Sequence, residues 1–196
     1  WCCLVGSEMC IRDRLYMVKI YTKTGDNGET SRFDGQRVRK DDSIIQLNGI
    51  VDECNCIIGL AISTSSDSKI NNILTDIQNK LFIAGTEISS CGKKIDLKIK
   101  SSDTKKIEEI IDIFEKELPP LTNFILPGGS ITSSYLHLSR AKSREVERCL
   151  ASISEEWIKD SNLNAFMNRL SDLFFVLARA VNKRNNINDV PWNSNN

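Results

Sequence analysis

Apolar side chains recur at helical spacing along most of this chain, and this periodicity limits its fold more than any other feature. One apolar residue at every third or fourth position predicts amphipathic α-helices. The pattern covers five segments, at residues 43–63, 68–90, 102–118, 130–154 and 162–186. Because the connections are short and strand-like alternation is nearly absent, we expect an all-α fold, a five-helix antiparallel bundle.

Capping residues stand near the expected helix ends. Residues 41–43 offer acidic and serine side chains for the start of the first helix, and Gly92 suits the end of the second. Ser102 or Asp103 would cap the third helix. Residues 93–101 alternate weakly and predict either a short strand or a loop.

The composition narrows the class of protein. Lysines plus arginines equal aspartates plus glutamates at 26 each, so no overall field attracts nucleic acid or an acidic membrane. No run reaches the roughly 18 apolar residues of a membrane span. We interpret Cys54, Cys56, Cys91 and Cys149 as reduced core residues. A cytoplasmic protein without nucleic-acid or membrane partners is expected.

The two ends of the chain differ from the rest. Residues 1–16, WCCLVGSEMCIRDRLY, show neither helical periodicity nor the continuous apolar run of a secretory signal. Met17 resembles a natural start, so we interpret residues 1–16 as a non-native or disordered extension. The single domain would then span residues 17–187, and residues 188–196 would be a polar tail that frays.

A glycine-rich segment, YTKTGDNGETS at residues 21–31, precedes the first helix. It lacks the lysine of a P-loop at the required place. Glycines can still turn backbone amides toward an anion, and hydroxyl and ammonium donors would help to bind a phosphate. These donors are Thr22, Lys23, Thr24, Thr30 and Ser31. A plain Asp-Asn-Gly turn is the alternative.

A stripe of arginines marks the fourth helix. Arg140, Arg144 and Arg148 span only about 80° of its circumference, with His137 and Glu147 alongside. Guanidinium groups this close repel one another unless an anion lies between them, and one glutamate does not suffice. The stripe predicts an anion-binding face, with a solvated basic face as the alternative.

Polar residues also interrupt the apolar helices elsewhere. Asn168, Asp172, Arg179 and Asn182 form a polar stripe with a salt-bridging pair on the last helix, for function or as a surface network. In the first helix, Asp52 stands in an apolar segment and needs an arginine partner.

Phe124 precedes a rigid Pro-Gly-Gly turn, where it would most simply fill the core. The chain has one histidine and shows no metal-ligand spacing and no nucleophile with an evident base. If this is an enzyme, its chemistry must depend on positioning and charge.

Six segments resemble, in order and spacing, the PduO-type ATP:cob(I)alamin adenosyltransferases. They are YTKTGDNGETS at 21–31, KDD at 40–42, GIVDECN at 49–55, FILPGG at 124–129, LHLSRAKSREVER at 136–148 and NRLSDLFFVLAR at 168–179. The resemblance covers nearly everything from Met17 to about Asn186. Six motifs in register are a specific signal.

The resemblance implies a five-helix bundle that forms a homotrimer and binds ATP and a corrinoid at subunit interfaces. An irregular N-terminal segment would fold over ATP. Its ATP-binding residues would be Thr22, Lys23, Thr24, Gly25, Thr30, Ser31 and Lys40. On the helices, the residues near ATP and its Mg²⁺ would be Arg144, Glu147, Arg148 and Asn168.

The resemblance also implies the residues around the corrinoid. Asp52 would form a salt bridge with Arg140 across the interface, and Phe124 would crowd the lower face of the corrin ring. There it would keep the dimethylbenzimidazole ligand off cobalt, which makes cob(II)alamin easier to reduce. With Arg144, these three residues are the catalytic candidates.

The implied reaction transfers the 5′-deoxyadenosyl group of ATP to the cobalt of cob(I)alamin and releases triphosphate. Cob(I)alamin is itself the nucleophile, so the protein needs none. A flavin reductase and an adenosylcobalamin-dependent enzyme would be partners. A non-catalytic corrinoid or nucleotide carrier is the alternative, and a purely structural oligomer is another.

One position departs from the pattern of many family members. Where they have a second arginine after Arg144, this chain has Glu145. A carboxylate near triphosphate is repulsive, so we predict weaker ATP binding than is typical. Glu145→Arg should then tighten it.

Overall fold

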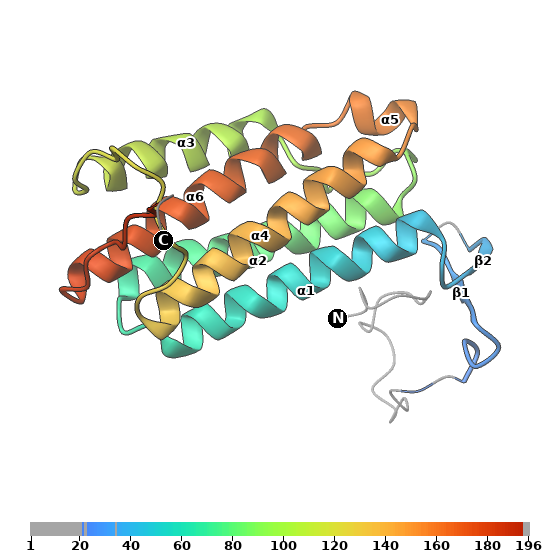
Figure 1. The fold of residues 1–196 in the computed structure, drawn as a ribbon. Helices are drawn as coiled ribbons and strands as arrows, with labels where there is room; N and C mark the ends of the chain where they lie inside the picture. Colours follow the sequence, from blue (N-terminus) through green and yellow to red (C-terminus); the bar gives the residue numbers. More distant parts are fainter. Residues whose placement is uncertain (1–20, 22, 34, 194–196) are drawn as a thin grey trace.

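The computed structural model describes residues 21, 23–33 and 35–193 (Figure 1). Its five long helices are α1 (Ser43–Thr64), α2 (Ser68–Ser89), α3 (Ser101–Glu115), α4 (Ile131–Ser152) and α6 (Leu163–Arg184). The smaller elements are α5 (Glu156–Lys159) and an antiparallel hairpin of β1 (Glu29–Ser31) and β2 (Arg37–Arg39). The predicted all-α five-helix bundle is confirmed. The expectations for residues 1–16 and for Thr22 concern positions outside the described residues.

Most neighbouring helices of the bundle run antiparallel, but α3 and α6 run parallel, because Asn162 contacts Ile99 at their starts and Arg184 contacts Glu117 at their ends. α4 packs on both α1 and α6, α2 packs on α1, and α3 packs on α6. The hydroxyl groups of Thr64 and Thr132 are 3.0 Å apart where α1 ends and α4 begins. Halfway along, Lys142 of α4 pairs with Glu53 of α1 at 2.7 Å. The two helices therefore lie side by side over their whole length.

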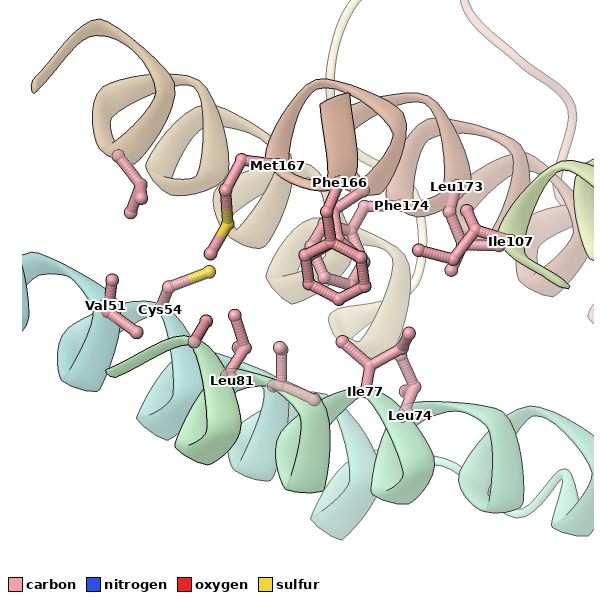
Figure 2. Packing of buried hydrophobic residues seen from close by; sticks show 14 of the residues in the cluster. Val51, Cys54, Leu74, Ile77, Leu81, Ile107, Phe166, Met167, Leu173 and Phe174 are labelled. Atoms are coloured by element: carbon pink, nitrogen blue, oxygen red, sulfur yellow. The ribbon is translucent and has the colours of Figure 1, made fainter. Parts of the chain in front are cut away.

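The core lies between the apolar faces of these helices. Figure 2 shows Val51 and Cys54 of α1 and Leu81 of α2 near Phe166 and Met167 of α6. None of these five side chains is more than 4% exposed. Burial of apolar faces, rather than helix propensity alone, stabilises helices of this kind.

The helix ends agree with the sequence in part. Asp42 caps α1, because its carboxylate accepts the Ile44 N–H at 3.0 Å. α3 begins earlier than predicted, with Lys100 as its N-cap. Asp103, in the first turn of the helix, accepts a hydrogen bond from the Lys100 backbone N–H at 2.9 Å. The preceding residues 93–100 contain no strand. Loop rather than strand is the correct alternative there.

α1 is long and apolar enough, by length and composition alone, to span a membrane, which we did not expect from the sequence. In the structure Leu47, Val51 and Ile58 are buried inside the bundle. A core helix passes the same test, because one of its faces must be apolar. α1 is accordingly a helix of the bundle.

The cysteines are only partly core residues. Cys54 is fully buried, and burial raises the pKa of its thiol to about 12. Cys56 is exposed, and Cys91 and Cys149 are half-buried. These four cysteines form no disulfides with one another. The expected burial of Cys56 was wrong, and the reduced state of the four thiols stays a prediction.

Candidate active site

The candidate residues are distributed along the length of the bundle. The β1–β2 hairpin lies beside the start of α1, whereas the loop before α4, which carries Phe124, lies at the opposite end (Figure 1). Arg140, Arg144 and Arg148 lie between these ends on α4, whose 22 residues span about 33 Å. The candidates therefore suit two ligands lying end to end rather than one compact molecule.

Close backbone approaches shape the N-terminal segment. Lys40 donates its backbone N–H to the carbonyl oxygen of Gly28 at 2.9 Å. A Cβ atom at Gly25 would lie 3.4 Å from the Lys40 ammonium, so the glycine leaves room for this side chain. Thr30 is buried on β1, and Ser31 beside it is half-buried. The Asp-Asn-Gly stretch is a turn in which the Gly28 N–H donates to the Gly25 carbonyl oxygen at 3.3 Å, and it leads into the β1–β2 hairpin. Phosphate binding by this segment stays a prediction.

Arg37 is a cation of this segment that we did not predict. Strand pairing sets it opposite Ser31, whose Oγ accepts a hydrogen bond from its guanidinium at 3.4 Å. The same guanidinium donates to the carbonyl oxygen of Thr24 at 2.8 Å. It also lies 3.5 Å from the Glu29 carboxylate, which offsets part of its charge. With Lys23 and Lys40 it adds cationic donors to the small ones, which suits an anionic ligand.

Arg140 and Arg144 line a hollow of about 420 Å³ between α3, α4 and α6. Arg169 of α6 lines the same hollow and was missed in the sequence. Its guanidinium donates to Glu108 at 3.1 Å and to Asp172 at 2.7 Å. Arg140 and Arg144 thus border a polar hollow with acidic walls, whereas Arg148 does not line it. Arg140 is half-buried, and Arg144 and Arg148 are both exposed.

The residues of the polar stripe of α6 have partners in two separate regions of the structure. We expected Asp172 and Arg179 to pair with each other, and this was wrong. Asp172 pairs with Arg169, and Arg179 pairs with Asp189 at 2.7 Å. The amide of Asn182 joins the loop before α4, donating to the Gly128 carbonyl oxygen at 2.9 Å. Only the Asn168 end of the stripe faces the arginine helix.

Glu147 and Asn168 meet across α4 and α6. The Asn168 amide donates to the Glu147 carboxylate at 2.8 Å, and both side chains are half-buried. Mg²⁺ prefers oxygen ligands and commonly keeps waters and substrate phosphates beside one or two protein groups. The described residues include no cluster of three or more metal-binding side chains. This pair therefore fits a metal that arrives with a phosphate ligand.

Asp52 and Arg140 are not paired within the chain. Among the described residues no salt bridge joins them, although both are half-buried. The Arg140 Nε atom is buried and finds no hydrogen-bond acceptor in this part of the chain. A buried guanidinium nitrogen without an acceptor is unfavourable, so this position has room for a hydrogen-bond partner beyond the described residues.

Phe124 is not a core residue. Its side chain is 81% exposed, which rules out the alternative that it fills the core. Its ring meets that of Trp192 edge-on, with the centroids 6.5 Å apart. The Trp192 N–H donates to the Phe124 carbonyl oxygen at 2.7 Å, so the described part of the tail is paired with this loop and is not frayed.

Glu145 has a partner that its sequence context did not reveal. Lys142 lies 2.7 Å from the Glu145 carboxylate and equally close to that of Glu53 on α1. These carboxylates raise the pKa of Lys142. The carboxylate that we expected to repel triphosphate is thus already paired with a cation, although it shares that cation with Glu53.

Comparison with known proteins gives one consistent result. The family model described as cobalamin adenosyltransferase matches residues 20–181. A corrinoid adenosyltransferase of Bacillus subtilis is 38% identical over 180 residues, which cover 89% of this chain and 92% of the relative. A human corrinoid adenosyltransferase is 39% identical over 169 residues, which cover 82% of this chain and 68% of the relative.

Solved structures agree in fold. A variant PduO-type ATP:corrinoid adenosyltransferase from Lactobacillus reuteri, complexed with cobalamin and ATP, superposes with a TM-score of 0.82 at 31% identity. The superposition covers 90% of this chain and 97% of the Lactobacillus reuteri chain. Another variant from that organism, complexed with ATP, gives a TM-score of 0.78 at 32% identity over 89% of this chain.

Proposed function

The chain belongs to the cobalamin adenosyltransferase family, and from this premise we propose how its residues share the work of the reaction. The enzyme transfers the 5′-deoxyadenosyl group of ATP to the cobalt of a reduced corrinoid. Cobalt attacks the 5′ carbon, the bond to the triphosphate oxygen breaks, and triphosphate leaves. The protein must align two substrates and stabilise the charge of the leaving group.

The order of the candidates along the bundle is the observation that carries this proposal. The β1–β2 hairpin lies at one end and the loop before α4, which contains Phe124, at the other. Arg144 and the Glu147–Asn168 pair lie between them, along α4. Triphosphate, adenosyl carbon, cobalt and lower corrin face follow one another in the same order in the reacting pair. Two substrates lying end to end account for candidates spread over about 33 Å.

The triphosphate is bound, in this proposal, by the hairpin and the arginine helix. The hydroxyl, amide and ammonium donors are Lys23, Thr24, Gly25, Thr30, Ser31 and Lys40. Thr22 is assigned with them from the family resemblance alone. Arg144 and Arg148 neutralise the charge that grows as triphosphate leaves, which requires no proton transfer. Arg37 joins these groups because it already binds Thr24 and Ser31.

Glu147 and Asn168 are the protein ligands proposed for Mg²⁺. When bound, the ion would help to neutralise the phosphates of ATP. The protein's share is to hold the carboxylate and the amide together, as their 2.8 Å hydrogen bond already does.

A homotrimer with interfacial sites is the proposed assembly. Within the described part of the chain the buried Nε of Arg140 has no hydrogen-bond partner, and no salt bridge joins Asp52 to Arg140. Pairing Asp52 of one subunit with Arg140 of the next would satisfy both. Leu138 and Ile131 on the outer face of α4 are 48% and 67% exposed, which suits burial in an interface.

Phe124 acts on the corrinoid by excluding a ligand. An exposed phenyl ring placed against the lower face of the corrin leaves no room for dimethylbenzimidazole on cobalt. A flavin reductase as electron donor, delivery to an adenosylcobalamin-dependent enzyme and a cytoplasmic location complete the proposal.

The test is an anaerobic assay with Mg-ATP and chemically reduced cob(I)alamin, following loss of the cob(I) absorption and release of triphosphate. We expect equimolar adenosylcobalamin and triphosphate, and a loss of kcat/KM of about 100-fold in Arg144→Met. Lys105→Met, an exposed charge change on α3, is the matched control and should leave the rate unchanged. Cobalamin binding without turnover would favour a carrier, and no thermal shift with Mg-ATP would favour a structural oligomer.

A further inference from the structure

The loop that carries Phe124 is fastened to α6 at both of its ends. At its start, Arg179 donates to the Pro119 carbonyl oxygen at 2.9 Å. At its finish, the Asn182 amide accepts the Ser130 N–H at 3.0 Å and donates to Gly128. Arg179 and Asn182 are only 7% and 3% exposed. Two buried polar side chains thus fix the ends of a loop whose middle residue is exposed.

The residues after α6 fasten the middle of the same loop. Ile125 and Pro191 form an antiparallel bridge, the Leu126 N–H donates to the Val190 carbonyl oxygen at 2.8 Å, and the Trp192 N–H donates to Phe124. The returning segment, residues 187–192, is itself anchored through Asp189, whose carboxylate binds the same buried Arg179 at 2.7 Å. One guanidinium therefore joins the loop to the returning segment.

We propose that Arg179 and Asp189 are positioning residues for Phe124, acting through the segment 187–192. The ion pair fixes this segment, its backbone bonds fix the loop on either side of Phe124, and the Trp192 ring supports the phenyl ring edge-on. The inference rests on the proposed role of Phe124 in keeping dimethylbenzimidazole off cobalt.

An exposed phenyl ring needs such support to do that task. A side chain that is 81% exposed has few neighbours to define its direction, so its backbone must define it. Displacing a metal ligand requires the ring at one place, and a misplacement of about 1 Å is enough to lose much of the effect. Asp189→Asn should release the segment, because the neutral amide no longer compensates the buried guanidinium.

The experiment uses the full chain with Mg-ATP and two oxidation states of cobalamin. With cob(II)alamin, absorption and paramagnetic resonance spectra report the fraction of cobalt without its lower ligand. With pre-reduced cob(I)alamin, which has no lower ligand, the quantity measured is the turnover rate. Asp189→Asn and Trp192→Ala should lower the ligand-free cob(II) fraction at least about threefold and keep cob(I) turnover within about twofold.

Controls separate this inference from its premise. Asp76→Asn removes an exposed ion pair with Lys106 on α2 and α3 and should change neither readout. Hydrogen exchange at Leu126 and Trp192 should accelerate in Asp189→Asn only if the ion pair fixes the loop. An unchanged cob(II) fraction, or equal losses in both readouts, would overturn the inference alone. Absence of cob(I) turnover in the wild type would overturn the proposed function with it.

Discussion

The β1–β2 hairpin and the Phe124 loop both present groups to a ligand, but the bundle supports them differently. The hairpin is tied to the start of α1 by the 2.6 Å ion pair of Arg32 with Asp42, and its donors are mostly exposed. The Phe124 loop is held by buried side chains of α6 and by the returning segment. Only the second is fixed in advance by the core.

The difference follows from what each ligand group requires. Triphosphate is flexible and highly charged, so a segment with many donors can close around it and gain from each contact. Blocking one face of a metal needs an apolar group at a fixed position, and no attraction to the ligand will place it. Preformed support is therefore expected at Phe124 and closure on the ligand at the hairpin.

The largest expected effect comes from a pair of glycines, one in each region. Gly129 has a φ of 108°, and a Cβ there would lie 2.2 Å from the Asn182 amide oxygen. Gly129→Ala should lower the free energy of unfolding by about 3 kcal/mol, from strain and displacement of Asn182. Urea unfolding monitored by circular dichroism measures this.

Gly28→Ala is the matched change in the hairpin. Gly28 has a φ of 80°, but a Cβ there would meet nothing within 4 Å. The strain is local, so the free energy of global unfolding should change by less than about 0.5 kcal/mol. The KM for ATP should rise about fivefold, because binding must overcome the strain. Equal losses of stability in both variants would end the distinction between the regions.

Acidification should lower the free energy of unfolding through the single histidine, His137, which lies on the Phe124 side of this comparison. Burial and Arg140 lower the pKa of His137, and Asp189 opposes them only in part. The unfolded chain then binds the proton more readily, so stability is full above about pH 6.5 and falls as the pH drops below it. The slope should not exceed about 1.4 kcal/mol per pH unit.

Urea titrations between pH 7.5 and 5.5 measure this slope, and His137→Gln should remove its histidine component. His137 contacts Phe175 on α6, so the variant can lose stability at every pH without affecting the test. A variant as steep as the wild type would assign the acid sensitivity to other groups. The hairpin has no histidine and should add nothing over this range.

The smallest effect is expected at Glu145. Because Lys142 already binds this carboxylate, Glu145→Arg should lower the KM for ATP by no more than about twofold. Initial rates at varied ATP measure it, with Glu145→Gln as the control for charge removal. A fall of about tenfold or more would show that the carboxylate acts on triphosphate despite Lys142, as the sequence alone suggested.

The helices were predictable because a periodic apolar pattern is a local property of the chain. Asp42 at the start of α1 and Ser130 at the start of α4 have the side chains that helix caps require. Lys100 gave no such signal, since its helix is capped from within by Asp103. Three-residue strands such as β1 are too short to show alternation.

The site was predictable only where its residues share a helix or a motif. The arginine stripe and the Asp52, Phe124 and Asn168 assignments came from spacing and resemblance, and their roles stay predictions. Arg37 and Asp189 were missed, because each acts through a partner brought close by a turn or a chain reversal. No period in the sequence encodes such pairings.

Asp42 couples closure of the first turn of α1 to the conformation of the hairpin. One of its carboxylate oxygens caps α1 through the Ile44 N–H, and the other binds Arg32 of the segment that follows β1. Any rearrangement of the hairpin on ATP that changes the Arg32 contact also changes how firmly the first turn of α1 is closed. By thermodynamic reciprocity, fraying of that turn must in return alter the affinity for nucleotide.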